Sequence, residues 1–235
     1  MKILKTVILA VAFALGGCSS DSEQSTVLLR KIVQTTGGEE HIATYHYDGN
    51  RLDYIDIGQD EIIDYTYSGN LISEISYESY EGDVVQQTLF YYQEGLLVKS
   101  VTTQPWQDFV YEAEYFYNPD NTVDYTVMAT DWDGSFSPGN PGKYFFDQEG
   151  SLIKVEQYGP AGTTVIQYDY DQNLNPYYNI AGYDRLMDFN SGMHNILNID
   201  GPNPRTFEYT YNSAGYPISA TVSSSGSQQT TQYIY

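Results

Sequence analysis

The chain is poor in cysteine, histidine and positive charge. Its 235 residues include one cysteine and three histidines, and 10 lysines and arginines stand against 31 aspartates and glutamates. A single cysteine excludes an internal disulfide framework and a zinc cluster built from thiolates. A formal net charge of −21 argues against binding of a phosphate backbone, which requires a basic face. We therefore expect no nucleic-acid partner.

Motifs for catalysis are missing as well. The histidines His41, His46 and His194 form no His-x-x-x-His or His-Glu pair, so we expect no zinc site. No Gly-x-Ser-x-Gly elbow, phosphate loop or Gly-rich dinucleotide turn occurs. We predict that the protein is not an enzyme and carries no cofactor. One alternative stays open: with 31 acidic residues, a carboxylate pair could make the chain a hydrolase of surface polysaccharide.

A short apolar stretch occupies the N-terminus. Lys2 and Lys5 precede residues 6–15, which are too few to span a bilayer as a helix. The stretch ends in Leu15-Gly16-Gly17-Cys18, which resembles the lipobox of bacterial lipoproteins. The resemblance implies that residues 1–17 are a signal peptide, removed before Cys18 is lipidated. The alternative is an ordinary secretory signal followed by a chance cysteine.

Residues 18–26 then form a polar tether behind the lipidated cysteine. Eight extended residues reach at most about 27 Å, so the body would stay close to the bilayer. By resemblance to lipoprotein sorting rules, Ser19 after the cysteine favours the outer membrane. Asp21 and Glu23 resemble the acidic export signal of surface lipoproteins in the Bacteroidetes. The expected location is therefore the bacterial outer membrane, with the lipid anchor as the membrane contact, and the acidic signal favours exposure at the cell surface.

The rest of the chain repeats one unit: two aromatic residues one position apart, a turn containing Gly or Asn, and an aliphatic return strand. Alternating aromatics predict a strand with one buried face, and Asp, Asn, Ser and Gly favour the turn. We expect the tyrosine face to form the core and the acidic face to be solvated. The copies are Tyr45-His46-Tyr47, Tyr65-Thr66-Tyr67, Phe90-Tyr91-Tyr92, Tyr115-Phe116-Tyr117, Tyr144-Phe145-Phe146, Tyr168-Asp169-Tyr170, Tyr209-Thr210-Tyr211 and Tyr233-Ile234-Tyr235.

The return strands break strict alternation just after the turn. Leu52-x-x-Ile55, Ile72-x-x-Ile75 and Leu152-x-x-Val155 each place two aliphatic residues three positions apart. A strand can keep both on one face if an extra residue is bulged out between them. We therefore predict a β-bulge near these turns.

Together the repeats predict an all-β fold, an antiparallel meander of about 14–16 strands closed into a barrel. Residues 27–235 form one domain, with an irregular insertion near 174–200 and a short helix within 182–190. The rhythm resembles YD-type repeats of bacterial surface proteins. The whole mature chain resembles a family of uncharacterised Bacteroidetes lipoproteins with a porin-like β-barrel fold, which implies a barrel and no known activity.

A membrane-spanning barrel is the disfavoured alternative. A spanning strand needs an outward apolar band about 25 Å tall. The apolar stripes of this chain run for three or four positions, or roughly 10 Å. A lipid anchor would also be redundant on a chain that already crosses the membrane.

Two long connections hold the candidate ligand-binding residues. Trp106 and Trp132 lie in segments punctuated by Pro and Gly, where aromatic rings could stack on sugars. Alternatively, each tryptophan could cap the end of the barrel core. Asp131 and Asp133 resemble the start of a calcium loop but lack its distal Glu, so they are weak metal candidates. The prediction is a non-catalytic outer-membrane lipoprotein that binds a glycan or an envelope protein, or serves a structural role.

Overall fold

The computed structural model describes residues 26–235 except residues 59–60, 80 and 131–133. The predicted lipidation site Cys18 and most of the tether lie outside this range. So do Trp132 and the two calcium candidates Asp131 and Asp133.

The described residues form 17 strands and two single turns of 3-10 helix, η1 (Pro105–Gln107) and η2 (Tyr183–Arg185). In this part of the chain no helix is long and apolar enough to cross a bilayer. The strands are β1 (Lys31–Thr36), β2 (Glu39–Asp48), β3 (Arg51–Gly58), β4 (Glu61–Ser68), β5 (Leu71–Glu78), β6 (Val84–Gln93), β7 (Leu96–Gln104), β8 (Phe109–Tyr117), β9 (Thr122–Thr130), β10 (Phe136–Pro138), β11 (Gly142–Phe146), β12 (Leu152–Gly159), β13 (Gly162–Leu174), β14 (His194–Asp200), β15 (Arg205–Tyr211), β16 (Pro217–Ser224) and β17 (Ser227–Ile234).

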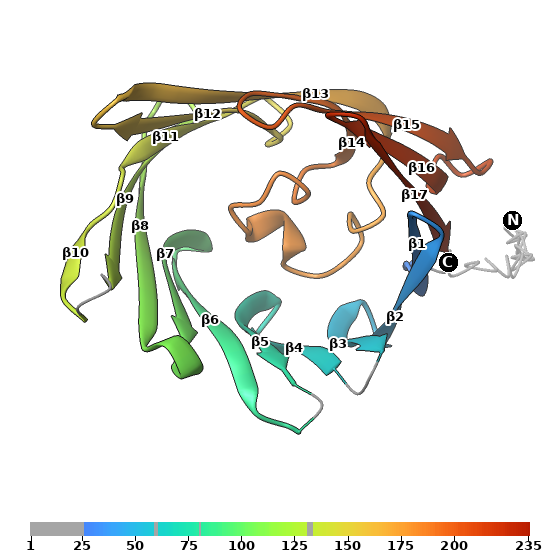
Figure 1. Ribbon diagram of the computed structural model, residues 1–235, viewed down its shortest axis with the longest axis horizontal. Helices are drawn as coiled ribbons and strands as arrows, with labels where there is room; N and C mark the ends of the chain where they lie inside the picture. The colour runs from blue at the N-terminus through green and yellow to red at the C-terminus, as the bar shows by residue number, and fades with distance from the viewer. Residues whose placement is uncertain (1–25, 59–60, 80, 131–133) are drawn as a thin grey trace, which may run out of the picture.

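The sheet closes on itself. Apart from β10, each strand pairs antiparallel with the next strand of the ring, and β1 pairs with both β2 and β17. Strand β9 pairs with β11 over Thr122–Tyr125, and the short β10 pairs only with the end of β9. Sixteen strands therefore form the ring seen in Figure 1, with β10 attached beside it. The predicted antiparallel meander closed into a barrel is confirmed.

The predicted bulges are also present. The register shifts between His46 and Tyr47, so that Tyr47 pairs with Leu52 while His46 pairs with Tyr54. Equivalent shifts occur at Tyr67 in the β4–β5 hairpin and at Phe146 in the β11–β12 hairpin. Because one residue of each return strand is bulged out, both aliphatic residues of the Leu-x-x-Ile pattern face inward.

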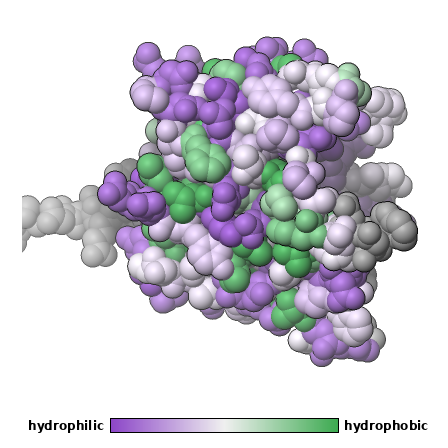
Figure 2. Space-filling model, turned by 90° about the vertical axis from the view of Figure 1, so that its left-hand side faces the viewer, coloured by the Kyte–Doolittle hydropathy of each residue, from purple (hydrophilic) through white to green (hydrophobic). Residues whose placement is uncertain are grey.

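The tyrosine face is the inner face of the barrel, as predicted. Tyr45 and Tyr168 are buried and belong to two separate hydrophobic clusters, one centred on Leu29, Leu52 and Ile55 and one on Leu152 and Ile196. Acidic residues at alternate positions, such as Glu114, Asp169 and Glu208, are exposed on the outer wall. On the side formed by β8–β11, the surface is largely hydrophilic or intermediate, with separate hydrophobic patches (Figure 2).

Candidate functional site

A strand-free segment between β13 and β14 lies inside the ring of strands (Figure 1). We call this segment, residues 175–193, the plug. It includes η2, which falls where the sequence predicted a short helix. The rings of Tyr177 and Tyr183 stack at 5.1 Å, and Tyr177 also meets the wall residue Tyr45 at 6.3 Å between ring centroids. The plug is therefore packed against the tyrosine lining rather than suspended in the lumen.

Polar contacts fix the plug to one end of the barrel. The backbone N–H of Ala181 donates to the carbonyl oxygen of Asn50 at 2.9 Å, in the β2–β3 turn. The side chain of Asn179 donates to the Val27 carbonyl at 2.8 Å and to the Tyr216 hydroxyl at 2.7 Å. We call this the plug end. Because neighbouring strands run antiparallel, the hairpin turns alternate between the two ends. Those of β4–β5, β6–β7, β8–β9 and β11–β12 also lie at the plug end, and the turns between them, including η1, lie at the opposite end, which we call the mouth end.

Asp188 is the acidic residue that the plug carries into the lumen. Its Oδ1 accepts a hydrogen bond from the backbone N–H of Asn190 at 2.7 Å. Burial raises the pKa of Asp188, and the hydrogen bonds from Asn190 offset part of that rise. The carboxylate is surrounded by phenols, including Tyr65 and Tyr183, whose pKa values are also raised, chiefly by burial.

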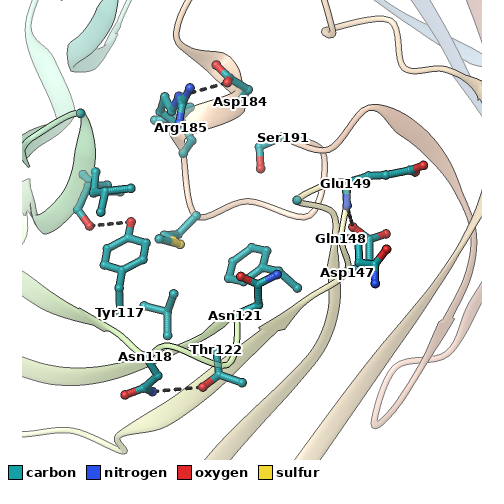
Figure 3. Close-up of a pocket in the computed structure, with 18 residues that line it drawn as sticks. Tyr117, Asn118, Asn121, Thr122, Asp147, Gln148, Glu149, Asp184, Arg185 and Ser191 are labelled. Carbon is teal, nitrogen blue, oxygen red and sulfur yellow. Dashed lines mark hydrogen bonds and ion pairs between the residues drawn. The ribbon is translucent and has the colours of Figure 1, made fainter.

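One cavity lies at the plug end, and we call it the rim pocket. It has a volume of about 470 Å³ and lies between the plug and the turns of the β6–β7, β8–β9 and β11–β12 hairpins (Figure 3). Its floor is apolar, with Leu97, Val123, Phe146, Leu186 and Met187. Its rim is polar, with Asn118, Asn121, Asp147, Gln148, Glu149, Asp184, Arg185 and Ser191. The pocket can therefore hold a molecule with both an apolar and a polar part.

The charged groups of the rim pocket come from the plug and from one hairpin turn. Arg185 Nε pairs with Asp184 Oδ2 at 3.1 Å, and both side chains are about half exposed. Glu149 of the hairpin turn also contacts β14, where His194 Nε2 lies 3.1 Å from Glu149 Oε2 and His194 Nδ1 lies 3.1 Å from the carbonyl oxygen of Asn173. Asp147 accepts hydrogen bonds from two backbone N–H groups of its own turn. Figure 3 shows Arg185 and Asp184 on the opposite side of the pocket from Asn118 and Thr122.

A second cavity of about 220 Å³, the inner cavity, lies deeper in the lumen. It shares Leu97, Leu186 and Met187 with the rim pocket, so the same side chains line both. The rest of its wall is aromatic and aliphatic apart from the carboxyl of Asp188: Tyr65, Ile75, Phe90, Tyr115 and Tyr183. The hydroxyl of Tyr115 is already paired with Ser100 Oγ at 3.1 Å.

A third cavity, the mouth groove, lies at the opposite end and contains Trp106. Its volume is about 440 Å³, and its apolar lining is Ile63, Tyr65, Ile75, Tyr77 and Val85. Trp106 on η1 is 73 % exposed, so it does not cap the barrel core. Gln104 Nε2 donates to Gln86 Oε1 at 2.9 Å on the polar side of the groove. The groove combines an exposed indole with amide groups.

The sequence-based candidates are not brought together. Trp106 is the one that lies within the described residues, and the structure tests neither Trp132 nor the calcium candidates. Among the described residues, no group of three His, Cys, Asp or Glu side chains could hold a metal ion. Sequence reasoning missed Arg185 and Met187, since nothing in their local pattern signals a pocket. The irregular insertion predicted near residues 174–200 was the signal that marked the plug.

Comparisons with known proteins identify the fold. No protein-family model matches the chain, and no curated protein shows a significant similarity to it. The structure is similar to the crystal structure of a porin-like protein from Bacteroides uniformis, with a TM-score of 0.52. The match covers 88 % of this chain and 97 % of that chain, at 11 % sequence identity. At this identity the similarity concerns the barrel fold alone.

Proposed function

We propose that the protein is a non-catalytic, lipid-anchored binding module at the bacterial outer membrane, which captures a neutral glycan at the mouth groove. Cys18 carries the anchor in this proposal, and the outer wall faces water. The fold of the porin-like neighbour is compatible with an outer-membrane protein. The three parts of the proposal rest on the outer wall, the packed lumen and the exposed Trp106.

The outer wall supports a tethered barrel rather than a spanning one. Lys99 pairs with Glu112 at 2.5 Å across β7 and β8, and Lys143 pairs with Asp124 at 3.2 Å across β9 and β11. A third pair joins Lys154 and Glu156 on β12. A charged side chain facing lipid near the bilayer midplane costs about 2–4 kcal/mol for Lys. These pairs are compatible with an aqueous environment, in which exposed ion pairs are common.

The packed lumen supports a role without catalysis. Tyrosine rings from opposite walls converge on the plug, as with Tyr168, whose ring stacks on Phe189 at 5.8 Å. The surfaces of these tyrosine rings are therefore buried in contacts that form the interior of the barrel. The acidic residue with raised pKa that lies deepest, Asp188, is hydrogen-bonded to the plug backbone rather than paired with a second carboxylate.

Trp106 is the observation that carries the ligand assignment. An indole that is 73 % exposed beside a groove is available for stacking on the apolar face of a sugar ring. The amides of Gln86 and Gln104 offer donors and acceptors for hydroxyl groups. A net charge of −21 repels polyanions, which favours a neutral glycan over an acidic one.

A single experiment with three variants of the full-length chain tests this proposal. Membrane and soluble fractions of expressing cells are collected, and the purified proteins are applied to an array of neutral oligosaccharides. Trp106→Ala should remain in the membrane fraction and lose roughly ten-fold or more in affinity, the equivalent of about 1.4 kcal/mol of stacking. Cys18→Ala should leave the membrane fraction and keep its affinity. Phe116→Ala, which removes an exposed ring from the outer wall, should change neither property.

The outcomes separate the parts of the proposal. Membrane retention of Cys18→Ala would contradict the anchor, and glycan binding unchanged in Trp106→Ala would contradict the mouth groove. Release of new reducing ends from a bound oligosaccharide would contradict the non-catalytic assignment and support the hydrolase alternative.

A further inference from the structure

The rim pocket and the inner cavity adjoin each other. Both are lined by Leu97 of β7 and by Leu186 and Met187 of the plug. The half nearer the rim carries amides and charges, and the half nearer the centre carries aliphatic and aromatic side chains with one buried carboxyl, that of Asp188. A ligand that fills both halves must have a polar end and an apolar chain.

The charges of the rim restrict the polar end. Among the described residues that line the rim pocket, Arg185 is the only cation, and it accompanies the carboxylates of Asp147, Glu149 and Asp184. A purely anionic head group would meet three carboxylates and one guanidinium. A zwitterionic head group can place its phosphate on Arg185 and its ammonium among the carboxylates. The rim is therefore complementary to a phosphoethanolamine group.

The inner cavity restricts the other end. Ile75, Phe90, Leu97, Leu186 and Met187 offer no hydrogen-bonding groups. The polar groups of the inner cavity are the carboxyl of Asp188 and the hydroxyls of Tyr65, Tyr115 and Tyr183. A sugar placed there could pair with those groups, but its remaining hydroxyl groups would lie against aliphatic side chains, which costs free energy for each. An acyl chain has no such groups and gains from burial.

The position of the chain start supports the same ligand. Val27, the second described residue, is held at the plug end by Asn179. If Cys18 is lipidated, a step that rests on the proposed function, the tether of about 27 Å keeps the rim pocket on the membrane side. The mouth groove with Trp106 then faces away from the bilayer.

We propose that the rim pocket and inner cavity bind one molecule of a single-chain zwitterionic amphiphile of the lysophospholipid class. The head group lies between Arg185 and the carboxylates of the rim, and the chain passes Met187 into the inner cavity. The inner cavity borders the mouth groove at Tyr65 and Ile75. The head group lies at the plug end, and Trp106 lies at the mouth end.

The test uses 1-palmitoyl-lysophosphatidylethanolamine, kept below its micelle concentration. The protein is the full chain carrying Cys18→Ala, because its own acyl chains then cannot occupy the cavity. We expect saturable binding of one molecule per chain by native mass spectrometry and calorimetry. Glycerophosphoethanolamine lacks the acyl chain, and palmitate lacks the zwitterionic head group. Each should bind with an affinity at least about ten-fold lower than that of the lysolipid.

Two substitutions and one control locate the site. Arg185→Gln should weaken binding roughly ten-fold by removing the charge-assisted contact to phosphate. Met187→Trp should abolish binding by filling the junction between the two cavities, with circular dichroism showing that the variant is folded. Arg205→Gln removes a cation at the mouth end and should bind normally. If Met187→Trp does not fold, Arg185→Gln decides alone, because its side chain is half exposed.

Three results would overturn the proposal: no saturable binding of the lysolipid, unchanged binding by Arg185→Gln, or displacement of the lysolipid by maltohexaose. The last result would assign the site to a sugar. A failed membrane anchor would leave this test intact, because the binding assay is carried out without the anchor.

Discussion

At the scale of single residues, the second aromatic of six of the eight repeats is a tyrosine whose hydroxyl contacts backbone. In these repeats the hydroxyl contacts the backbone at a buried residue just after the turn of the preceding hairpin or, for Tyr47, at Leu29 just before β1. Five hydroxyls donate in this way: Tyr47 to Leu29, Tyr92 to Ile72, Tyr117 to Leu97, Tyr170 to Leu152 and Tyr235 to Pro217, over 2.7–3.0 Å. Tyr67 reverses the polarity and accepts from the N–H of Leu52 at 3.0 Å. Tyrosine therefore links successive repeats where phenylalanine would only pack.

Tyr47→Phe tests this link. Tyr47 donates to the carbonyl of Leu29, which is 0 % exposed, so the substitution leaves a buried acceptor without its partner. We expect a loss of about 1 kcal/mol in the free energy of unfolding, measured by urea titration. The ring remains, and so does its contact with the Arg30 guanidinium at 5.1 Å.

Tyr91→Phe is the matched control for that substitution. Tyr91 points to the outer wall and is 46 % exposed, so its hydroxyl can be hydrated with or without folding. Its loss should leave the free energy of unfolding unchanged. Equal effects of the two substitutions would show that the hydroxyl of Tyr47 contributes nothing specific.

At the scale of elements, the plug is held by close backbone approach as well as by its side chains. Gly182 adopts a positive φ of 72° and lies directly against the β4–β5 turn. A Cβ at this position would lie 2.6 Å from the carbonyl oxygen of Asn70 and 3.0 Å from the N–H nitrogen of Ile72. Both neighbours are backbone atoms, so they cannot move away by a change of rotamer as a side chain could. Glycine is required here for its size and for its conformation.

Gly182→Ala should therefore destabilise the plug more than a Gly→Ala substitution at a positive φ that causes no steric clash. Gly150 has a similar φ of 85° with nothing within 4 Å of its Cβ position, so Gly150→Ala pays about 1 kcal/mol for the conformation alone. We expect Gly182→Ala to exceed that cost and to speed hydrogen exchange in residues 175–193 while the strands stay protected. Equal exchange in both variants would mean that the plug does not depend on this contact.

At the scale of the whole molecule, local sequence pattern predicted most of the fold, but it could not predict the cavities. Hairpins, bulges and the inward tyrosine face follow from residues a few positions apart, such as Leu52 and Ile55. Closure depends on β1 meeting β17, which lies almost the whole chain away. The rim pocket joins turns of three hairpins to Arg185 of the plug. No local sequence pattern indicates these contacts between distant segments, because they depend on how the ring closes and where the plug packs inside it.

Because many tyrosines are buried across the barrel, we can predict how the stability of the whole molecule depends on pH. Burial raises the pKa of Tyr92 and Tyr125 to about 12, and it raises the pKa values of Tyr45, Tyr144 and Tyr233 further. In the unfolded chain these phenols ionise near pH 10. Above that pH the folded state holds protons that the unfolded state has lost, so the free energy of unfolding falls as pH rises.

We therefore expect stability to be fully retained below about pH 10 and to fall steeply above it, by up to about 1.4 kcal/mol per pH unit for each such tyrosine. Many phenols should then ionise together as the barrel opens. Tyrosinate absorbance and far-ultraviolet circular dichroism, followed in one alkaline titration, should change in a single coincident step for most of the absorbance. A gradual rise in tyrosinate near pH 10 with native circular dichroism would mean that the rings face solvent, and the tyrosine-lined interior would have to be abandoned.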